Sequence, residues 1–417
     1  MLKWEKDLVV IGAGPAGLAA AIAARDAGIS NLVVLERDYE LGGILNQCIH
    51  NGFGLHYFQE ELTGPEYAER FVQELEKREI PFQTDAMVIG LDSQKNVTFA
   101  CQDLGLVEIK AKAVILAMGC RERTRAAINI PGTRPAGVYN AGTVQNMVNI
   151  EDLLPGKEIV IVGSGDIGLI MARRLTLEGA NVKAVVEIMP YPGGLSRNIA
   201  QCLEDFDIPL YLSHTVMKIK GKDRIERVLV APVDENMKPI EKKAFPIDCD
   251  TLVLSVGLIP ENELSREAGV EIDRVTGGPV VNESLETTIP GIFACGNVLQ
   301  VHDLVDNVTR ESQRAGLMAA KHILEDGSQD CNIQTVALEN VRYVIPHKIS
   351  GSFDVEFFLR ASQPLSKATL IVGDNLLTKK MAEAKPGEMI NITISKDKLS
   401  LVKDNLTFRL TGEVRSQ

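Results

Sequence analysis

The sequence predicts an α/β fold in which two similar strand–turn–helix–strand repeats are followed by a small all-β domain. Three observations carry this prediction. Two apolar strands each run into a Gly-x-Gly-x-x-Gly turn and then a helical pattern, at residues 7–17 and 159–168. An acidic residue ends the second strand of each repeat. From about residue 334 onward, short alternating strands broken by Gly and Pro replace the helical spacing.

The first repeat starts near the N-terminus, and its second strand ends in Glu36. Its turn contains Gly12, Gly14 and Gly17. In such a turn the first glycine permits a tight bend, the second lets the backbone approach a pyrophosphate, and the third lets the helix pack on the strand. The unpaired N–H groups at the start of the helix favour an anion. This repeat therefore predicts a dinucleotide site of the Rossmann type.

The second repeat has the same plan, with Gly163, Gly165 and Gly168 in the turn and Glu187 at the end of the second strand. Each acid follows the first glycine of its turn by 24 residues (36 − 12 and 187 − 163). A carboxylate at this position accepts hydrogen bonds from ribose hydroxyls and repels the 2′-phosphate of NADP. The second site is therefore expected to prefer NAD(H), although Lys183 or Arg197 nearby would weaken the preference. The alternative reading of each acid is a solvated strand end.

The segments between and after the repeats indicate how the chain divides. An apolar strand at 112–119 precedes a crossing to the second repeat, and a strand at 251–257 closes the second sheet. The segment 288–297 looks like a return to the first sheet, so the first domain is expected to be discontinuous. We expect three domains: residues 1–125 with 265–330, residues 126–264, and a β-rich domain at 331–417.

Composition excludes several classes of protein. A net charge of −12 disfavours nucleic acid as a partner, and no apolar run reaches the roughly 18 residues of a membrane span. The N-terminus lacks the zones of an export signal, so a cytoplasmic location is expected. The seven cysteines are scattered and form no CxxC or CxxxxC pair, so we expect neither a disulfide scaffold nor a metal site.

Together these segments resemble the two-dinucleotide-binding-domain flavoproteins, the pyridine nucleotide-disulfide oxidoreductase-like superfamily, over residues 5–325. Further motifs that carry the resemblance are Gly42-Gly43, Ala117-Met118-Gly119, the segment 257–262 and the segment 288–297. The resemblance implies FAD in the first domain, NAD in the second, and an FAD/NAD(P)-dependent oxidoreductase. The residues expected to bind the two cofactors are Gly12, Gly14, Gly17, Glu36, Gly42, Gly43, Gln47, Gly119, Gly296 and Asn297 for FAD, and Gly163, Gly165, Gly168, Glu187 and Gly257 for NAD.

The chain departs from the family pattern at three places. Asn297 stands where the family usually has an Asp that binds the ribityl chain, and an amide oxygen still accepts that bond. Met118 replaces the more usual Thr. The redox cysteine pair beside the flavin is missing, so electrons must leave the flavin by another route.

A closer resemblance is to a subgroup found with glycerol-3-phosphate dehydrogenase-type flavoproteins. The segments that suggest it are 43–50, 134–137, 191–194 and 301–305. It implies electron transfer in the company of a small cysteine-rich electron-transfer protein and a second flavoprotein subunit, with the oligomeric state left open. Related amine- and opine-oxidising proteins carry a cysteine-rich iron–sulfur segment, but the C-terminal region here has only Cys331, so no cluster is expected.

Four residues are candidates for catalysis. Cys48 and His50 follow the Gly42-Gly43 turn. Cys48 is either a reactive thiolate or a packed side chain, and His50 is a candidate proton donor. His302 is a candidate proton relay beside the flavin ring, and Asp303 either caps the long helix expected at about 303–324 or acts in catalysis.

The predicted chemistry is hydride transfer between nicotinamide and flavin N5, in either direction, followed by electron transfer to or from a partner or a small-molecule acceptor. Two alternatives stay open. One is a self-contained NADH oxidase or peroxidase that uses Cys48. The other is a non-catalytic nucleotide-binding subunit of a flavoprotein complex.

Overall fold

A computed structural model describes residues 2–325 and 330–414, which fall into two compact units. Unit 1 consists of the described residues of Met1–Cys120 and Pro260–Ser416, and unit 2 is Arg121–Ile259. The units divide five residues before the boundaries expected from the sequence, at 120 instead of 125 and at 259 instead of 264. Parts of the expected ranges, at 326–329 and 415–417, lie outside the described residues.

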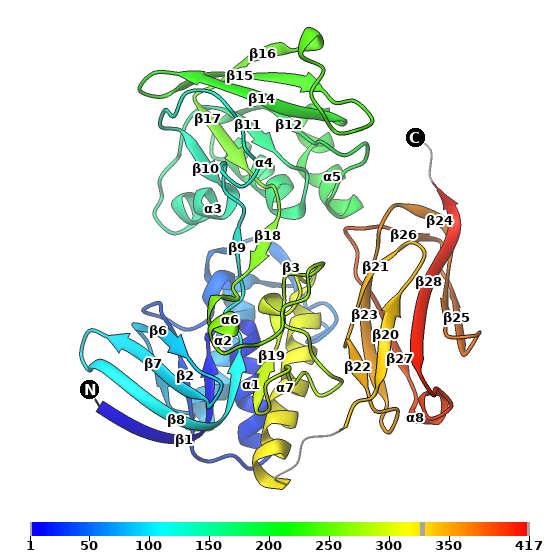
Figure 1. Cartoon of the computed structure of the whole chain (residues 1–417). Helices are drawn as coiled ribbons and strands as arrows, with labels where there is room; N and C mark the ends of the chain where they lie inside the picture. The colour runs from blue at the N-terminus through cyan, green and yellow to red at the C-terminus, as the bar shows by residue number, and fades with distance from the viewer. Residues whose placement is uncertain (1, 326–329, 415–417) are drawn as a thin grey trace. The chain divides into compact units, whose positions relative to one another are not determined.

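A seven-stranded sheet forms the centre of unit 1, in the order β5-β2-β1-β8-β7-β6 with β19 also paired to β8 (Figure 1). Strand β8 pairs parallel with β1 along most of its length, and on its other side it pairs antiparallel with β7 along its first half and parallel with β19 at its end. The strands of this sheet are β1 (Leu2–Ile11), β2 (Leu32–Leu35), β5 (Phe82–Gln83), β6 (Ala86–Leu91), β7 (Asn96–Cys101), β8 (Gly105–Leu116) and β19 (Ile292–Ala294). Because β19 comes from after residue 260, the sheet is built from two separate segments of the chain, as the sequence predicted.

Two helices pack together beside this sheet, α1 (Pro15–Asp26) and α7 (Val305–Glu325). Their contact is close, because a Cβ atom at Gly316 would overlap the carbonyl oxygen of Ala20. A third helix, α2 (Gly64–Lys77), begins at Thr63 with a capping box. The remaining short elements are η1 (Gly43–Gln47), β3 (Asn51–Phe53), β4 (Leu62–Thr63), α6 (Glu263–Glu267) and η4 (Gly296–Val298).

The C-terminal part of unit 1 has two sheets, β22-β20-β28-β24-β25 with β26 on β24, and β21-β23-β27. Phe357 and Phe408 join the two sheets in one core, with their ring centroids 5.1 Å apart. The elements are β20 (Ile333–Ala337), β21 (Val341–Ile345), β22 (Lys348–Ile349), β23 (Val355–Ala361), β24 (Leu365–Val372), β25 (Leu377–Lys380), β26 (Glu383–Ala384), β27 (Ile390–Ile394), α8 (Lys396–Leu399) and β28 (Asn405–Val414). The alternating pattern therefore forms strands, with one four-residue helix that the sequence did not predict.

Unit 2 contains a parallel sheet of order β10-β17-β11-β12-β13 and an antiparallel sheet β14-β15-β16. The strands are β10 (Val138–Asn140), β11 (Glu158–Val162), β12 (Asn181–Val186), β13 (Leu210–Tyr211), β14 (His214–Gly221), β15 (Ile225–Pro232), β16 (Phe245–Asp248) and β17 (Thr251–Leu254). The helices are α3 (Ala141–Asn149), α4 (Asp166–Leu177), α5 (Ser196–Cys202), η2 (Glu204–Phe206) and η3 (Glu241–Lys243). Two short strands, β9 (Cys120–Glu122) and β18 (Leu258–Pro260), lie where the chain passes between the units.

The two glycine turns occupy equivalent places in the parallel parts of the two sheets. The turn after β1 leads into α1, and the turn after β11 leads into α4. In open α/β sheets, ligands bind outside the carboxyl ends of the strands, which is where both turns lie. Among the described residues, no helix is both long enough and apolar enough to span a bilayer.

Candidate dinucleotide sites and the buried cluster before α7

Packing explains the first and third glycines of both turns. Gly12 has φ of +99°, and a Cβ there would lie 2.5 Å from the carbonyl oxygen of Ala117. A Cβ at Gly17 would overlap the carbonyl oxygen of Gly12. In unit 2, Gly163 has φ of +95°, and a Cβ at Gly168 would lie 2.7 Å from the Gly163 carbonyl oxygen. These four positions need glycine for the strand–helix connection itself.

At the second glycine of each turn, neither the backbone conformation nor a neighbouring atom of the protein requires glycine. Gly14 has φ of −72° and ψ of −173°, and the nearest atom to a Cβ there is the Gly43 Cα at 4.0 Å. Gly165 has φ of −66° and ψ of 163°, with no atom within 4 Å of a Cβ. Alanine would fit both backbones, so the open space at each helix N-terminus suits a group that approaches from outside the chain. A dinucleotide pyrophosphate meets this description.

The acids at the strand ends repeat the same geometry in both units. The buried Glu36 carboxylate accepts hydrogen bonds from the backbone N–H of Ala13 at 2.6 Å and of Asp38 at 2.9 Å. The buried Glu187 carboxylate accepts equivalent bonds from Ser164 and Met189, both at 2.9 Å. Each acid therefore ties its strand end to the glycine turn. A carboxylate has lone pairs beyond these bonds, so ribose binding by either acid stays a prediction.

Unit 2 has supporting contacts that the sequence reasoning missed. The Ser164 hydroxyl donates to Glu187 at 2.7 Å and accepts from the N–H of Gly193 at 2.9 Å. Asp166, the first residue of α4, accepts from the N–H of Leu195 at 2.8 Å and from the Asn198 amide at 2.7 Å. These bonds hold the 191–198 segment against the second glycine turn. The only signal in the sequence was an acid at the first position of a helix.

The remaining glycines expected at the cofactors share a left-handed backbone, which favours glycine. A Cβ at Gly43 would also lie 2.9 Å from the Gly14 Cα, so the Gly42-Gly43 turn lies against the first glycine turn. The positive φ values are +110° at Gly42, +59° at Gly43, +71° at Gly119, +98° at Gly257 and +72° at Gly296.

Gln47, Cys48 and His50 lie at the end of η1 and directly after it, all half-buried. The Cys48 thiol donates to the carbonyl oxygen of Ile44 at 3.3 Å, and burial raises its pKa to about 12. At neutral pH this side chain is a thiol, which favours the packed reading over the reactive thiolate. The His50 ring lies 5.0 Å from the Phe53 ring, and its role as a proton donor stays a prediction.

Asn297 and His302 come together before α7. The Asn297 side-chain oxygen accepts a bond from the backbone N–H of His302 at 3.0 Å, and its amide nitrogen lies 3.6 Å from the Cys120 sulfur. The His302 Nε2 atom lies 3.2 Å from the Glu311 carboxylate, and both side chains are 1% exposed. Sequence reasoning missed Glu311, whose signal is a carboxylate within the buried run at the start of α7.

Asp303 contacts the C-terminal strands of unit 1. Its carboxylate accepts from the N–H of Met389 at 2.9 Å, and the Arg360 guanidinium lies 3.9 Å away. Among the hydrogen bonds of the described residues, none joins the Asp303 side chain to the backbone at the start of α7, as a capping role would require. Instead, the backbone N–H of Asn307 bonds to the carbonyl oxygen of Leu304 at the start of the helix.

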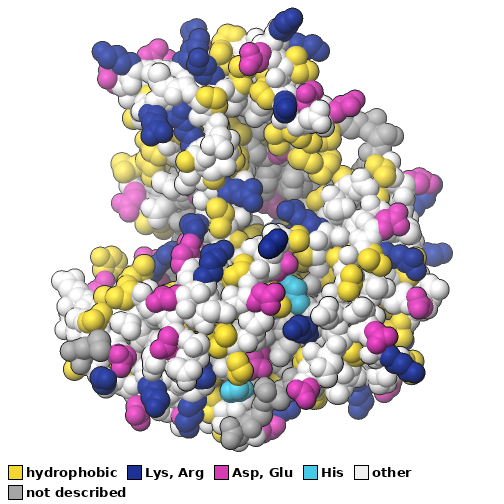
Figure 2. Space-filling view, in the orientation of Figure 1, with side chains coloured by type: hydrophobic (Ala, Val, Ile, Leu, Met, Phe, Trp, Pro, Cys, Tyr) yellow, Lys and Arg dark blue, Asp and Glu magenta, His cyan; other side chains and the backbone are white. Residues whose placement is uncertain are grey.

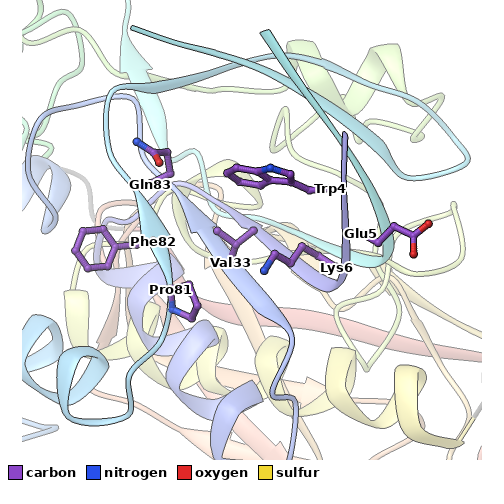
Figure 3. A pocket seen from close by; sticks show the side chains of 7 residues that line it. All are labelled: Trp4, Glu5, Lys6, Val33, Pro81, Phe82 and Gln83. Carbon is purple, nitrogen blue, oxygen red and sulfur yellow. The ribbon is translucent and has the colours of Figure 1, made fainter. Parts of the chain in front are cut away.

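A separate hollow of about 380 Å³ is lined by residues of β1, β2 and β5 and by Pro81 (Figure 3). Its lining includes Trp4 and Lys6 of β1, Val33 of β2 and Phe82 of β5. Its lining includes none of the residues that the sequence predicts to bind either dinucleotide. It is therefore not the predicted dinucleotide site.

The visible surface carries acidic and basic side chains interspersed (Figure 2). With a net charge of −12, binding of a dinucleotide would depend on the local geometry of the turns. Within the described ranges, which include all seven cysteines, no disulfide forms, and no group of three or more His, Cys, Asp or Glu side chains is placed to hold a metal ion.

Comparison with known proteins supports this architecture. The chain is 26% identical over 284 residues to the hydrogen cyanide synthase subunit HcnB of Pseudomonas protegens, which covers 63% of this chain and 59% of that protein. It is 25% identical over 323 residues to an NAD(P)H sulfur oxidoreductase (CoA-dependent) of Pyrococcus abyssi, which covers 73% and 65%. An NADH oxidase of Methanocaldococcus jannaschii is 27% identical over 336 residues, covering 76% and 69%. The chain thus spans less than two thirds of the length of the first two relatives.

Among solved structures, thioredoxin reductase of T. acidophilum superposes with a TM-score of 0.62 at 21% identity, covering 76% of this chain and 98% of that one. This likeness shows the fold, with two Rossmann-type domains. The sequence profile of the family described as pyridine nucleotide-disulphide oxidoreductase matches residues 6–319. Since this match spans three quarters of the chain and includes both glycine turns, the chain belongs to the pyridine nucleotide-disulphide oxidoreductase family of FAD- and NAD(P)-dependent oxidoreductases.

Proposed function

We propose that this chain transfers hydride between NAD(H) and FAD, with FAD at the glycine turn of unit 1 and NAD(H) at the turn of unit 2. The observation that carries the proposal is the repeated geometry of the two turns. In both, the second glycine has no neighbour that demands it, while a buried acid holds the turn in place. FAD, when bound, supplies the hydride-accepting and electron-releasing chemistry, and the protein supplies position and charge.

The preference for NAD(H) rests on Glu187. Its carboxylate lies buried at the end of β12, beside the glycine turn of unit 2. A negative charge at this place opposes the 2′-phosphate of NADP(H), because two anions in a partly buried site repel strongly. We expect NADH to bind more tightly than NADPH.

We propose further that the electrons pass to or from a partner. The seven cysteines form no CxxC or CxxxxC pair, the spacing by which disulfide reductases of this family pass electrons on from the flavin. HcnB is named as a subunit of hydrogen cyanide synthase, and a relative from Agrobacterium tumefaciens, 25% identical over 317 residues, is named as a subunit of opine oxidase. The partner that the subgroup resemblance implies is a glycerol-3-phosphate dehydrogenase-type flavoprotein with a small cysteine-rich protein, in glycerol 3-phosphate metabolism.

The Cys48-dependent oxidase or peroxidase is less well supported, because burial keeps Cys48 in the thiol form. A non-catalytic role within a complex has one observation in its favour, the names of these two relatives. The open second glycine of unit 2 argues against it, since a scaffold has no evident need for a nicotinamide site.

An anaerobic titration of the holoprotein with NADH and with NADPH tests the proposal, with flavin absorbance as the readout. Bleaching by NADH at lower concentration than by NADPH is expected, and Glu187→Gln should narrow the difference. A protein that binds FAD but is bleached by neither nucleotide would overturn the hydride-transfer proposal in favour of a non-catalytic subunit. Turnover with oxygen or peroxide that disappears in Cys48→Ser would favour the oxidase.

A further inference from the structure

The loop before α7 contains a buried pair of ionisable side chains. Glu311 receives three contacts, from the backbone N–H of Gly296 at 2.7 Å, from the Gln300 amide nitrogen at 2.8 Å and from His302 Nε2 at 3.2 Å. The Gly296 and Gln300 nitrogens can only donate, so the carboxylate is their acceptor. A carboxylate in this role also accepts from His302, which means that Nε2 carries a hydrogen.

This assignment leaves the other ring nitrogen, Nδ1, as the reactive position. Within the described part of the chain, His302 Nδ1 is buried and has no hydrogen-bond partner. The side-chain oxygen of Gln300, two residues earlier, is also buried without a partner. Buried polar atoms that lack partners cost free energy, so two of them in one short loop indicate a polar group that binds there.

The imidazole is held in place from several sides. The Asn297 side chain binds the backbone N–H of His302, and the Phe358 ring of β23 meets the imidazole edge-on at 5.7 Å between centroids. Arg360, also on β23, donates to the carbonyl oxygen of Val301 at 3.0 Å. The C-terminal strands of unit 1 therefore position the same loop that carries His302.

We propose that His302 exchanges the proton that accompanies hydride transfer, that Glu311 positions its imidazole, and that Arg360 of the C-terminal strands holds the loop. This inference rests on the proposed function. The overall reaction is NADH + H⁺ + FAD → NAD⁺ + FADH₂, in which the hydride carries both electrons. His302 supplies the H⁺ from Nδ1 and changes from imidazolium to neutral imidazole, and solvent protonates it again. In the reverse direction it accepts that proton.

The charged and titratable groups around this imidazole come from three places. Glu311 faces it from α7, and Asp303 and Asp306 lie in the adjoining loop and first helical turn. Arg360 approaches from β23, and its Nε donates to the Tyr343 hydroxyl of β21 at 3.2 Å. A measured pH dependence must therefore be shown to come from His302 and not from these neighbouring groups.

The test uses FAD-loaded full-length protein. Histidine labelled with ¹⁵N reports which ring nitrogen carries the hydrogen, and His302→Gln identifies the His302 signal among the six histidines. We expect an Nε2–H signal for His302 in the oxidised wild type, a changed signal in Glu311→Gln, and a wild-type signal in Glu325→Gln at the exposed end of α7. An Nδ1–H neutral form in the wild type would overturn the proposal.

Stopped-flow bleaching by NADH between about pH 5 and 8, where histidine titrates, gives the second readout. We expect His302→Gln and Glu311→Gln to slow bleaching about tenfold or more and to flatten its pH profile, with rates measured per bound FAD. Arg360→Met should slow it less, and the exposed Arg342→Met on β21 should match wild type. If His302→Gln and Arg360→Met keep the wild-type rate and pH profile, His302 does not exchange the proton. This result overturns the proposal even if Glu311→Gln does not fold. A wild type that NADH does not bleach would instead refute the proposed function, and the histidine signals then still decide the positioning role of Glu311.

Discussion

The substitution Glu36→Gln tests whether FAD binds at the glycine turn of unit 1. Glu187→Gln, at the equivalent position of unit 2, is its matched control. Glu36 accepts two backbone hydrogen bonds, from Ala13 and Asp38. A glutamine has one acceptor oxygen, so one of these N–H groups would face an amide NH₂. Loss of one hydrogen bond to a charged acceptor costs about 1.5–3 kcal/mol. Because the bond to Ala13 lies inside the glycine turn, we expect the turn to lose its shape for FAD.

The same free energy predicts two measured changes. The melting temperature of the protein without FAD should fall by roughly 3–12 °C, using about 2–4 °C per kcal/mol for a domain of this size class. If the free energy of the lost hydrogen bond, about 1.5–3 kcal/mol, is also lost in full from FAD binding, FAD affinity falls by about ten- to a hundredfold, since about 1.4 kcal/mol is a factor of ten.

Differential scanning calorimetry and fluorescence titration of the apoprotein with FAD measure these effects. Glu187→Gln should leave FAD affinity at the wild-type value and instead reduce the preference for NADH over NADPH. If Glu36→Gln binds FAD as tightly as wild type, the acid does not hold the turn. If Glu187→Gln weakens FAD binding as much as Glu36→Gln does, the assignment of one nucleotide to each unit is wrong.

Three other changes test separate steps of the argument. Gly165→Ala fits the backbone and meets no atom within 4 Å, so the protein should fold and retain FAD while NADH affinity falls at least tenfold in an anaerobic titration; unchanged affinity would show that no pyrophosphate approaches this turn. Gly17→Ala would overlap the Gly12 carbonyl oxygen, so we expect little folded, FAD-containing protein on purification, and a stable yellow variant would contradict the packing argument. Burial raises the pKa of Cys48 to about 12, so the rate at which iodoacetamide modifies Cys48, followed by peptide mass spectrometry, should keep rising with pH above 9; a plateau near neutral pH would indicate a reactive thiolate.

Local patterns were enough to place the glycine turns and the strand-end acids. Each glycine turn joins a strand to a helix directly, and a single short connection has few possible geometries. The acids are found by counting, because a helix and a second strand of ordinary length separate them from the turn. The alternating residues after 334 predicted strands for the same reason, since the period of two follows from the pleat of the backbone.

The partners of the candidate catalytic residues were beyond such reasoning. Glu311 looks like one more charged residue in a helix until the fold brings Gly296, Gln300 and His302 to its carboxylate. Asp303 was expected either to cap α7 or to act in catalysis. Its carboxylate accepts a hydrogen bond from the backbone N–H of Met389, 86 residues later, and a catalytic role stays a prediction.

By itself, the sequence determined the duplicated architecture and the positions of both dinucleotide turns, because each depends on contacts between neighbouring segments. The motif at 288–297 also predicted the return of the chain to the first sheet, although that return pairs β19 with β8, 178 residues earlier (292 − 114). Only the tertiary structure decided the protonation state favoured at Cys48, the acceptor for His302 and the contact of the C-terminal strands with the loop before α7. These depend on burial and on pairs of residues far apart in the chain, and the free energy of a buried charge or hydrogen bond is set by which atoms surround it.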